Sequence, residues 1–86
     1  MQKQEIVQFL MERVKAMSTK PQAVETMTEA TEISALGIDS VTLINLVVEI
    51  EQKFDIFLED DEMTVERFNS VQDIAALISE KISVSN

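Results

Sequence analysis

The chain contains one glycine and one proline among its 86 residues. Glycine and proline supply the tight turns between the strands of small β proteins, so a chain with one of each is poorly suited to a turn-rich β fold. Its length fits one small domain, near the lower end of what folds unaided. Apolar residues make up 45% of the chain, which is enough for a core. We therefore expect residues 1–86 to form a single helical domain.

Apolar residues recur at spacings of three and four, the pattern of helices that bury one face. The pattern predicts longer helices over about residues 2–17, 40–54 and 71–82. A short helix is expected over 61–67, because acidic residues stand at its N-terminal end, where the helix dipole favours them. Residues 70–73 resemble a capping box at the start of the last helix, and residues 83–86 are expected to fray. The stretch 19–39 is predicted to be a long, mostly polar loop. The expected fold is all-α: a small four-helix bundle with three longer helices, one short helix and a long first loop.

Cysteine and histidine are absent from the sequence. Their absence excludes disulfides, the usual zinc ligand sets, and Cys–His or Ser–His nucleophile pairs. The acidic cluster at 59–62 lacks the alternating spacing and central glycine of an EF-hand loop, so no metal site is expected. No residue set indicates catalysis, and we expect the chain not to be an enzyme.

The net charge of −9 is distributed unevenly. Residues 1–20 carry +2, from four basic and two acidic side chains, whereas residues 21–86 carry −11, from three basic and 14 acidic ones. Nucleic acid binding is not expected, because it needs clustered basic residues. The acidic surface favours a basic protein partner, or it serves solubility alone. No signal peptide or membrane-length apolar run is visible, so the expected protein is a cytoplasmic monomer without membrane insertion.

The segment 36–40 precedes the most apolar predicted helix and contains Gly37, the only glycine. Glycine permits a turn with positive φ, and Asp39 is a good N-cap candidate that would leave the Ser40 hydroxyl facing solvent. A phosphodiester on Ser40 would lie at the helix N-terminus, where free N–H groups favour an anion. An ordinary loop-to-helix junction with Ser40 itself as N-cap explains these residues equally well. Both interpretations stay open from the segment alone.

The segment resembles the phosphopantetheine attachment motif of acyl carrier proteins, which have L-G-x-D-S at this junction. Further resemblances follow in order along the chain, at Ile33, Leu46, Ile50, Glu51, Phe54 and residues 70–74. Membership of this family implies a covalent 4'-phosphopantetheine arm on Ser40, transferred from coenzyme A, with Asp39 and Gly37 shaping the attachment turn. The arm's thiol would hold acyl groups as thioesters for partner enzymes of polyketide or fatty-acid-type biosynthesis.

The resemblance also implies a partner-facing surface around the helix at 40–54. Val41 and Val48, seven residues apart, would contact partners, with Glu49 on a charged rim and Leu36 and Ile38 beside Ser40. The implied partners are a phosphopantetheinyl transferase and acyl-transferring or chain-modifying enzymes with basic docking surfaces.

The chain departs from the family pattern at four positions: Thr42, Asn45, Asp55 and Glu59. The first two are often acidic in the family, and the last two are usually glycine and proline, which suggests a specialised carrier. Two alternatives remain. One is a carrier for an amino acid or aryl acid in nonribosomal-peptide-type biosynthesis. The other is a non-carrier acidic helical module that binds a basic protein.

Overall fold

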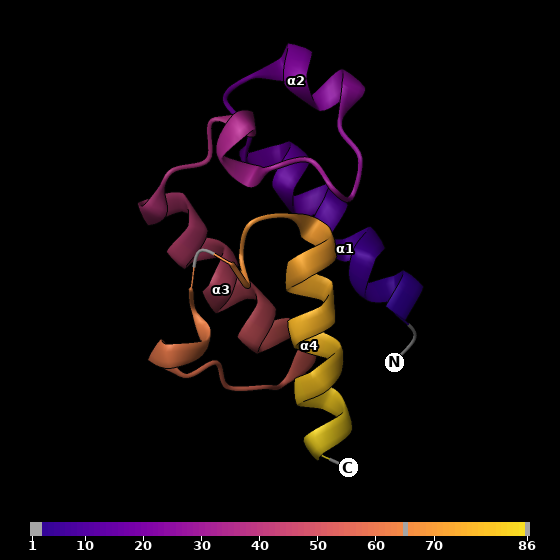
Figure 1. The fold of residues 1–86 in the computed structure, drawn as a ribbon, viewed down its shortest axis with the longest axis vertical. Helices are drawn as coiled ribbons and strands as arrows, with labels where there is room; N and C mark the ends of the chain where they lie inside the picture. Colours follow the sequence, from indigo (N-terminus) through magenta and orange to yellow (C-terminus); the bar gives the residue numbers. More distant parts are fainter. Residues whose placement is uncertain (1–2, 65, 86) are drawn as a thin grey trace.

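The computed structural model describes residues 3–64 and 66–85 and is helical throughout its regular parts (Figure 1). Three long helices are α1 (Lys3–Met17), α3 (Ser40–Phe54) and α4 (Val71–Ser85). A short helix, α2 (Pro21–Thr26), and two 3-10 helices, η1 (Ile33–Leu36) and η2 (Asp60–Glu62), lie between them. No named strand occurs in the described residues, although Glu32 and Ser70 form one isolated antiparallel bridge. The predicted all-α fold with three longer helices and one short helix is confirmed.

The core is built from the apolar stripes of the three long helices, with α1 contacting both α3 and α4 (Figure 1). Each helix contributes side chains that are at most 1% exposed: Ile6, Leu10 and Val14 from α1, Leu46 and Ile50 from α3, and Val71, Ile74, Ala75, Leu77 and Ile78 from α4. The intervening segments add Ile33, Leu36, Leu58 and Phe68 to the same cluster. Burial of a large aliphatic side chain contributes about 1.5–3 kcal/mol. This cluster therefore holds the loops as well as the helices.

The short α-helix lies at α2 and not at 61–67, so the prediction of a continuous loop over 19–39 is wrong. Pro21 is the first residue of α2, where its fixed φ suits a helix and its missing N–H costs nothing. Residues 61–67 form no α-helix among the positions described: η2 ends at Glu62, and a turn covers 66–68. Val65 lies outside the described residues.

Side-chain capping stabilises the start of η2. The Glu59 carboxylate accepts from the Glu62 backbone, and the Glu62 carboxylate accepts from the Glu59 N–H at 3.0 Å. The box thus closes within a single turn, and Met63, the first apolar side chain after it, is 38% exposed. Met63 therefore offers little apolar burial to a longer helix.

The ends of the long helices agree with the sequence pattern in most places. Helix α3 has the predicted bounds, and α1 covers the predicted range from Lys3 onward, with Gln2 outside the described residues. The Ser70 hydroxyl accepts from the Asp73 N–H at 3.3 Å, as the capping pattern predicts. The Asp73 carboxylate accepts from the Ser70 hydroxyl at 2.9 Å, whereas a capping box has it accept from the backbone N–H. Helix α4 continues to Ser85, so the expected fraying after 82 is wrong for residues 83–85. Within the described residues, no helix has the length and apolar character needed to cross a membrane.

Candidate functional site

The turn that leads into α3 depends on Gly37. Its φ is 78°, in the left-handed region that glycine adopts without strain, and its N–H donates to the Ser34 carbonyl at 3.1 Å. A Cβ atom at this position would overlap the hydroxyl oxygen of Thr19. Gly37 is therefore required both by the backbone conformation and by a close neighbour.

The segment after α1 clamps this turn through hydrogen bonds. The Leu36 carbonyl accepts from the Ser18 hydroxyl at 2.7 Å and from the Thr19 N–H at 3.2 Å. The Thr19 hydroxyl donates to the Gly37 carbonyl at 3.2 Å. Two consecutive carbonyls of the turn are thus fixed by residues that precede them by 17 or 18 positions. The sequence analysis missed Ser18 and Thr19, because nothing in the chain order shows which loop meets the turn.

Asp39 is the N-cap of α3, and its carboxylate accepts from the Thr42 N–H at 2.9 Å. This bond, followed by a second one from the Thr42 side chain, lowers the pKa of Asp39 below its ordinary value of 3.8. Ser40 is consequently the first residue of the helix and is exposed to solvent. The alternative in which Ser40 is the N-cap does not hold, so its hydroxyl is not used to cap the helix.

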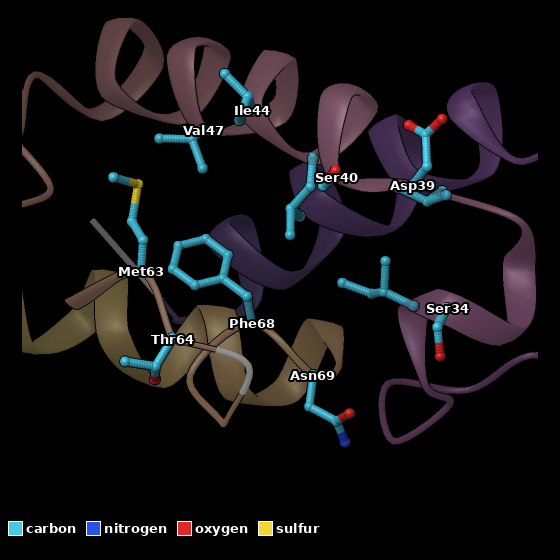
Figure 2. A pocket seen from close by; sticks show the side chains of 12 residues that line it. Ser34, Asp39, Ser40, Ile44, Val47, Met63, Thr64, Phe68 and Asn69 are labelled. Atoms are coloured by element: carbon cyan, nitrogen blue, oxygen red, sulfur yellow. The ribbon is translucent and has the colours of Figure 1, made fainter. Parts of the chain in front are cut away.

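An apolar cavity of about 410 Å³ opens beside Ser40, between α3 and the segment 63–69 (Figure 2). Five polar residues line it: Ser34, Asp39, Ser40, Thr64 and Asn69. Its apolar walls are Ile33, Ile38, Leu43, Ile44, Val47, Met63 and Phe68. Figure 2 shows Phe68 and Met63 on one side and Val47 of α3 on the other. An apolar group joined to Ser40 could therefore enter an apolar space directly.

The outer face of α3 carries an exposed apolar stripe. Val41 is 67% exposed and Val48 is 45% exposed, so neither belongs to the core. Ile44, three residues after Val41 and four before Val48, is 61% exposed and completes the stripe. The sequence analysis did not select Ile44, although its helical spacing from the two valines was the available signal.

Three residues that the sequence analysis placed on a partner-facing surface have other positions in the structure. Leu36 is fully buried and Ile38 is 7% exposed, so both support the glycine turn from inside and cannot form a partner surface. Their apolar side chains anchor the two ends of the glycine turn. Glu49 is half-buried in an ion pair with Arg13 of α1, with 2.6 Å between Arg13 Nε and a carboxylate oxygen. Its charge is therefore compensated within the chain.

Comparison with known proteins gives one family for this chain. The family model described as "Phosphopantetheine attachment site" matches residues 16–78, which include the turn, α3 and every residue that lines the cavity. The acyl carrier protein of Campylobacter concisus is 37% identical over 65 residues, which cover 76% of this chain and 79% of that protein.

Two further relatives are also acyl carrier proteins or their homologs. An acyl carrier protein homolog of Mycoplasmopsis pulmonis is 40% identical over 55 residues, covering 64% of this chain and 73% of that protein. The acyl carrier protein of Bdellovibrio bacteriovorus is 36% identical over 53 residues, covering 62% of this chain and 65% of that protein, slightly less than two thirds of its length.

Proposed function

This chain belongs to the acyl carrier protein family, whose members hold a covalent 4'-phosphopantetheine arm, and from that membership we propose that Ser40 is the residue that carries the arm here. The observation that carries the proposal is the place of Ser40. It is exposed in the first turn of α3, Asp39 has already capped the helix, and an apolar cavity begins beside it. Its hydroxyl is therefore accessible to an enzyme.

The residues around Ser40 prepare it for modification and do not catalyse it. A phosphopantetheinyl transferase would join the Ser40 oxygen to the phosphorus of the arm, while the P–O–P bond of coenzyme A breaks and adenosine 3',5'-bisphosphate leaves. The serine proton needs a base, and the transferase must supply it, because the chain has no histidine and the Asp39 carboxylate is engaged with Thr42. The N–H groups at the start of α3 favour the phosphodiester that results.

The bound arm supplies a terminal thiol that holds cargo as a thioester. The cavity beside Ser40 suits a hydrocarbon chain, since burial of each methylene is worth about 0.8 kcal/mol. We therefore favour acyl cargo of the polyketide or fatty-acid type over an amino acid, because an ammonium group would lose its hydration in this apolar space. The chain would deliver this cargo to partner enzymes and would not itself catalyse a reaction.

The whole chain is proposed to act as one carrier domain, residues 1–86, because a single core cluster joins all its long helices. It is further proposed to be a monomer, since a net charge of −9 opposes self-association.

Intact-mass measurement tests the assignment of Ser40. The chain is incubated with coenzyme A, magnesium and a broad-specificity phosphopantetheinyl transferase, beside the variants Ser40→Ala and Ser34→Ala. Ser34 is the matched control, because it also lies at the cavity and is exposed. The wild type and Ser34→Ala should gain one phosphopantetheine and Ser40→Ala none. Loading of Ser40→Ala, or no loading of the wild type by several transferases, would refute the proposal.

A further inference from the structure

A transferase can act on the Ser40 hydroxyl efficiently only if the start of α3 holds that hydroxyl in one place. The N–H groups of this first turn have no partners within the helix, and helix ends fray most readily. Asp39 closes the turn through its bond to Thr42, and Asp39 follows directly after the glycine turn, residues 36–38. The placement of Ser40 therefore depends on the direction in which the glycine turn enters α3.

Gly37 is the residue of this turn with the greatest backbone freedom, because it has no side chain to restrict its φ and ψ. The carbonyls on both sides of it are nevertheless fixed. The Leu36 carbonyl accepts from the Ser18 hydroxyl and the Thr19 N–H, and the Gly37 carbonyl accepts from the Thr19 hydroxyl. The two peptide planes that meet at Gly37 are thus both held by the segment after α1.

This segment is itself fixed at both ends. The Ser18 N–H donates to the Val14 carbonyl at 3.0 Å and closes the last turn of α1, while the Ser18 hydroxyl accepts from the Lys20 N–H at 3.0 Å. The Lys20 carbonyl accepts from the Ala23 N–H at 3.0 Å at the start of α2, where Pro21 restricts the backbone. The two hydroxyls therefore meet the glycine turn from a rigid support.

The hydroxyl contacts are poorly placed to contribute much to the stability of the fold. Thr19 is exposed and Ser18 is half-buried, so water could satisfy both carbonyls in place of the hydroxyls. The side chains of Leu36 and Ile38 are buried in the core with or without these bonds. Water cannot supply a fixed direction, however, because it is not attached to α1. Fixing the orientation of the Gly37 peptide planes is what remains for the hydroxyls to do.

We propose that Ser18 and Thr19 are positioning residues for the modification of Ser40, an inference that rests on the proposed function of Ser40. Neither side chain bonds to Ser40. They act through Gly37 and Asp39, by fixing the path along which the chain enters α3. Transfer of the arm requires the Ser40 oxygen to be aligned with the phosphorus that it attacks, and a small misplacement slows such a step strongly. Loss of either hydroxyl should therefore lower kcat for loading rather than raise KM.

The test measures kcat and KM for loading of the carrier by a broad-specificity phosphopantetheinyl transferase with coenzyme A and magnesium. Ser18→Ala and Thr19→Val should each lower kcat about tenfold and leave KM nearly unchanged. Thr19→Ser keeps the hydroxyl and should restore the kcat of the wild type. Thr26→Val is the matched control, because Thr26 is exposed and its hydroxyl donates to a carbonyl of α2. Its kcat should equal that of the wild type.

Thermal melts show that each variant is folded at the assay temperature. An unchanged kcat in both Ser18→Ala and Thr19→Val would overturn the inference, as would a raised KM at constant kcat. The same holds if Thr19→Ser is as slow as Thr19→Val, or if Thr26→Val loses as much kcat as Thr19→Val. In each of these cases, loading of the wild type leaves the proposed function standing. Failure to load the wild type would overturn both.

Discussion

At the scale of single residues, the turn that precedes α3 depends on the absence of a side chain at Gly37. Its positive φ and the hydroxyl of Thr19 leave no room for a side chain. The turn also places Asp39 at the start of α3 and Ser40 one residue later. A change at Gly37 should therefore affect both stability and the presentation of Ser40.

Gly37→Ala should destabilise the fold, with a backbone cost of about 1–3 kcal/mol for a non-glycine residue held in this region. The additional overlap with Thr19 should be relieved in the double variant Thr19→Ala/Gly37→Ala, which we expect to be more stable than the sum of the two single changes predicts. Urea unfolding of the four proteins measures this coupling. Additive effects would show that Thr19 does not restrict the site.

The Asp39 cap predicts a pH dependence with a definite sign. Because its pKa is lower in the folded state, its contribution to stability is complete above its ordinary pKa of 3.8 and is lost as the pH falls through the folded value. Asn also caps helices well but does not titrate. Between pH 6 and pH 3, the melting temperature of Asp39→Asn should thus fall by less than that of the wild type. Equal losses would contradict the assignment of this titration to Asp39.

The residues that the sequence could identify were those whose neighbours in the chain define their role. Capping rules located the loop-to-helix junction at Asp39 and Ser40 but left open which of the two is the N-cap, and only the family resemblance assigned the arm to Ser40. Leu36 and Ile38 were misjudged, because only the tertiary fold shows that the loop turns them inward. Ser18 and Thr19 were missed for the same reason, since their partners lie 18 residues away.

At the scale of elements, an ion pair between η2 and α4 lies next to the cavity wall opposite α3. Glu62 of η2 accepts from Lys81 of α4 at 2.9 Å and from the Glu59 N–H. The bond from Glu59, followed by that from Lys81, lowers the pKa of Glu62, and the bond to Glu62 raises the pKa of Lys81. The stabilisation from this ion pair should be complete above the ordinary pKa of Glu62, 4.5, and below the ordinary pKa of Lys81, 10.5. It should be lost as either partner becomes neutral.

Lys81→Met should loosen η2 and the adjoining residue Met63, which lines the cavity. Amide hydrogen exchange over residues 59–64 should accelerate, while exchange in α1 should stay unchanged. Arg67→Met is the matched control, because it removes an ion pair to Glu80 that is more exposed and so contributes little. Equal acceleration in both variants would show that the Lys81–Glu62 pair does not hold this segment specifically.

The elements differed in how far the sequence could define them. Helices α1, α3 and α4 have long apolar stripes, and periodicity located them. Helix α2 has six residues and none that is buried, so it leaves almost no periodic signal. The short helix predicted over 61–67 relied on its acidic start, and acids at a first turn do not show how long the helix continues.

At the scale of the whole molecule, the cavity exists because segments from three parts of the chain meet. Ile33 comes from η1, Leu43 and Val47 from α3, and Phe68 from the connection to α4. The sequence left open whether a chain this small encloses cargo, because the count of apolar residues does not reveal how they pack. The assembled structure provides an apolar space next to Ser40.

Cargo that enters this cavity should stabilise the folded state. With the arm on Ser40, an octanoyl group should raise the melting temperature above that of the acetylated protein, with an upper limit of about 0.8 kcal/mol for each methylene buried. The acetylated form is the control, since it has the same arm and thioester. Identical melting temperatures would show that the chain stays in solvent.

Direct localisation of the arm tests the central claim. The protein is isolated from its own cells, digested, and examined by tandem mass spectrometry of the peptide that contains residues 34–40. We predict one phosphopantetheine on Ser40 and an unmodified Ser34. An arm on another residue, or a peptide that is unmodified in every preparation, would contradict the account.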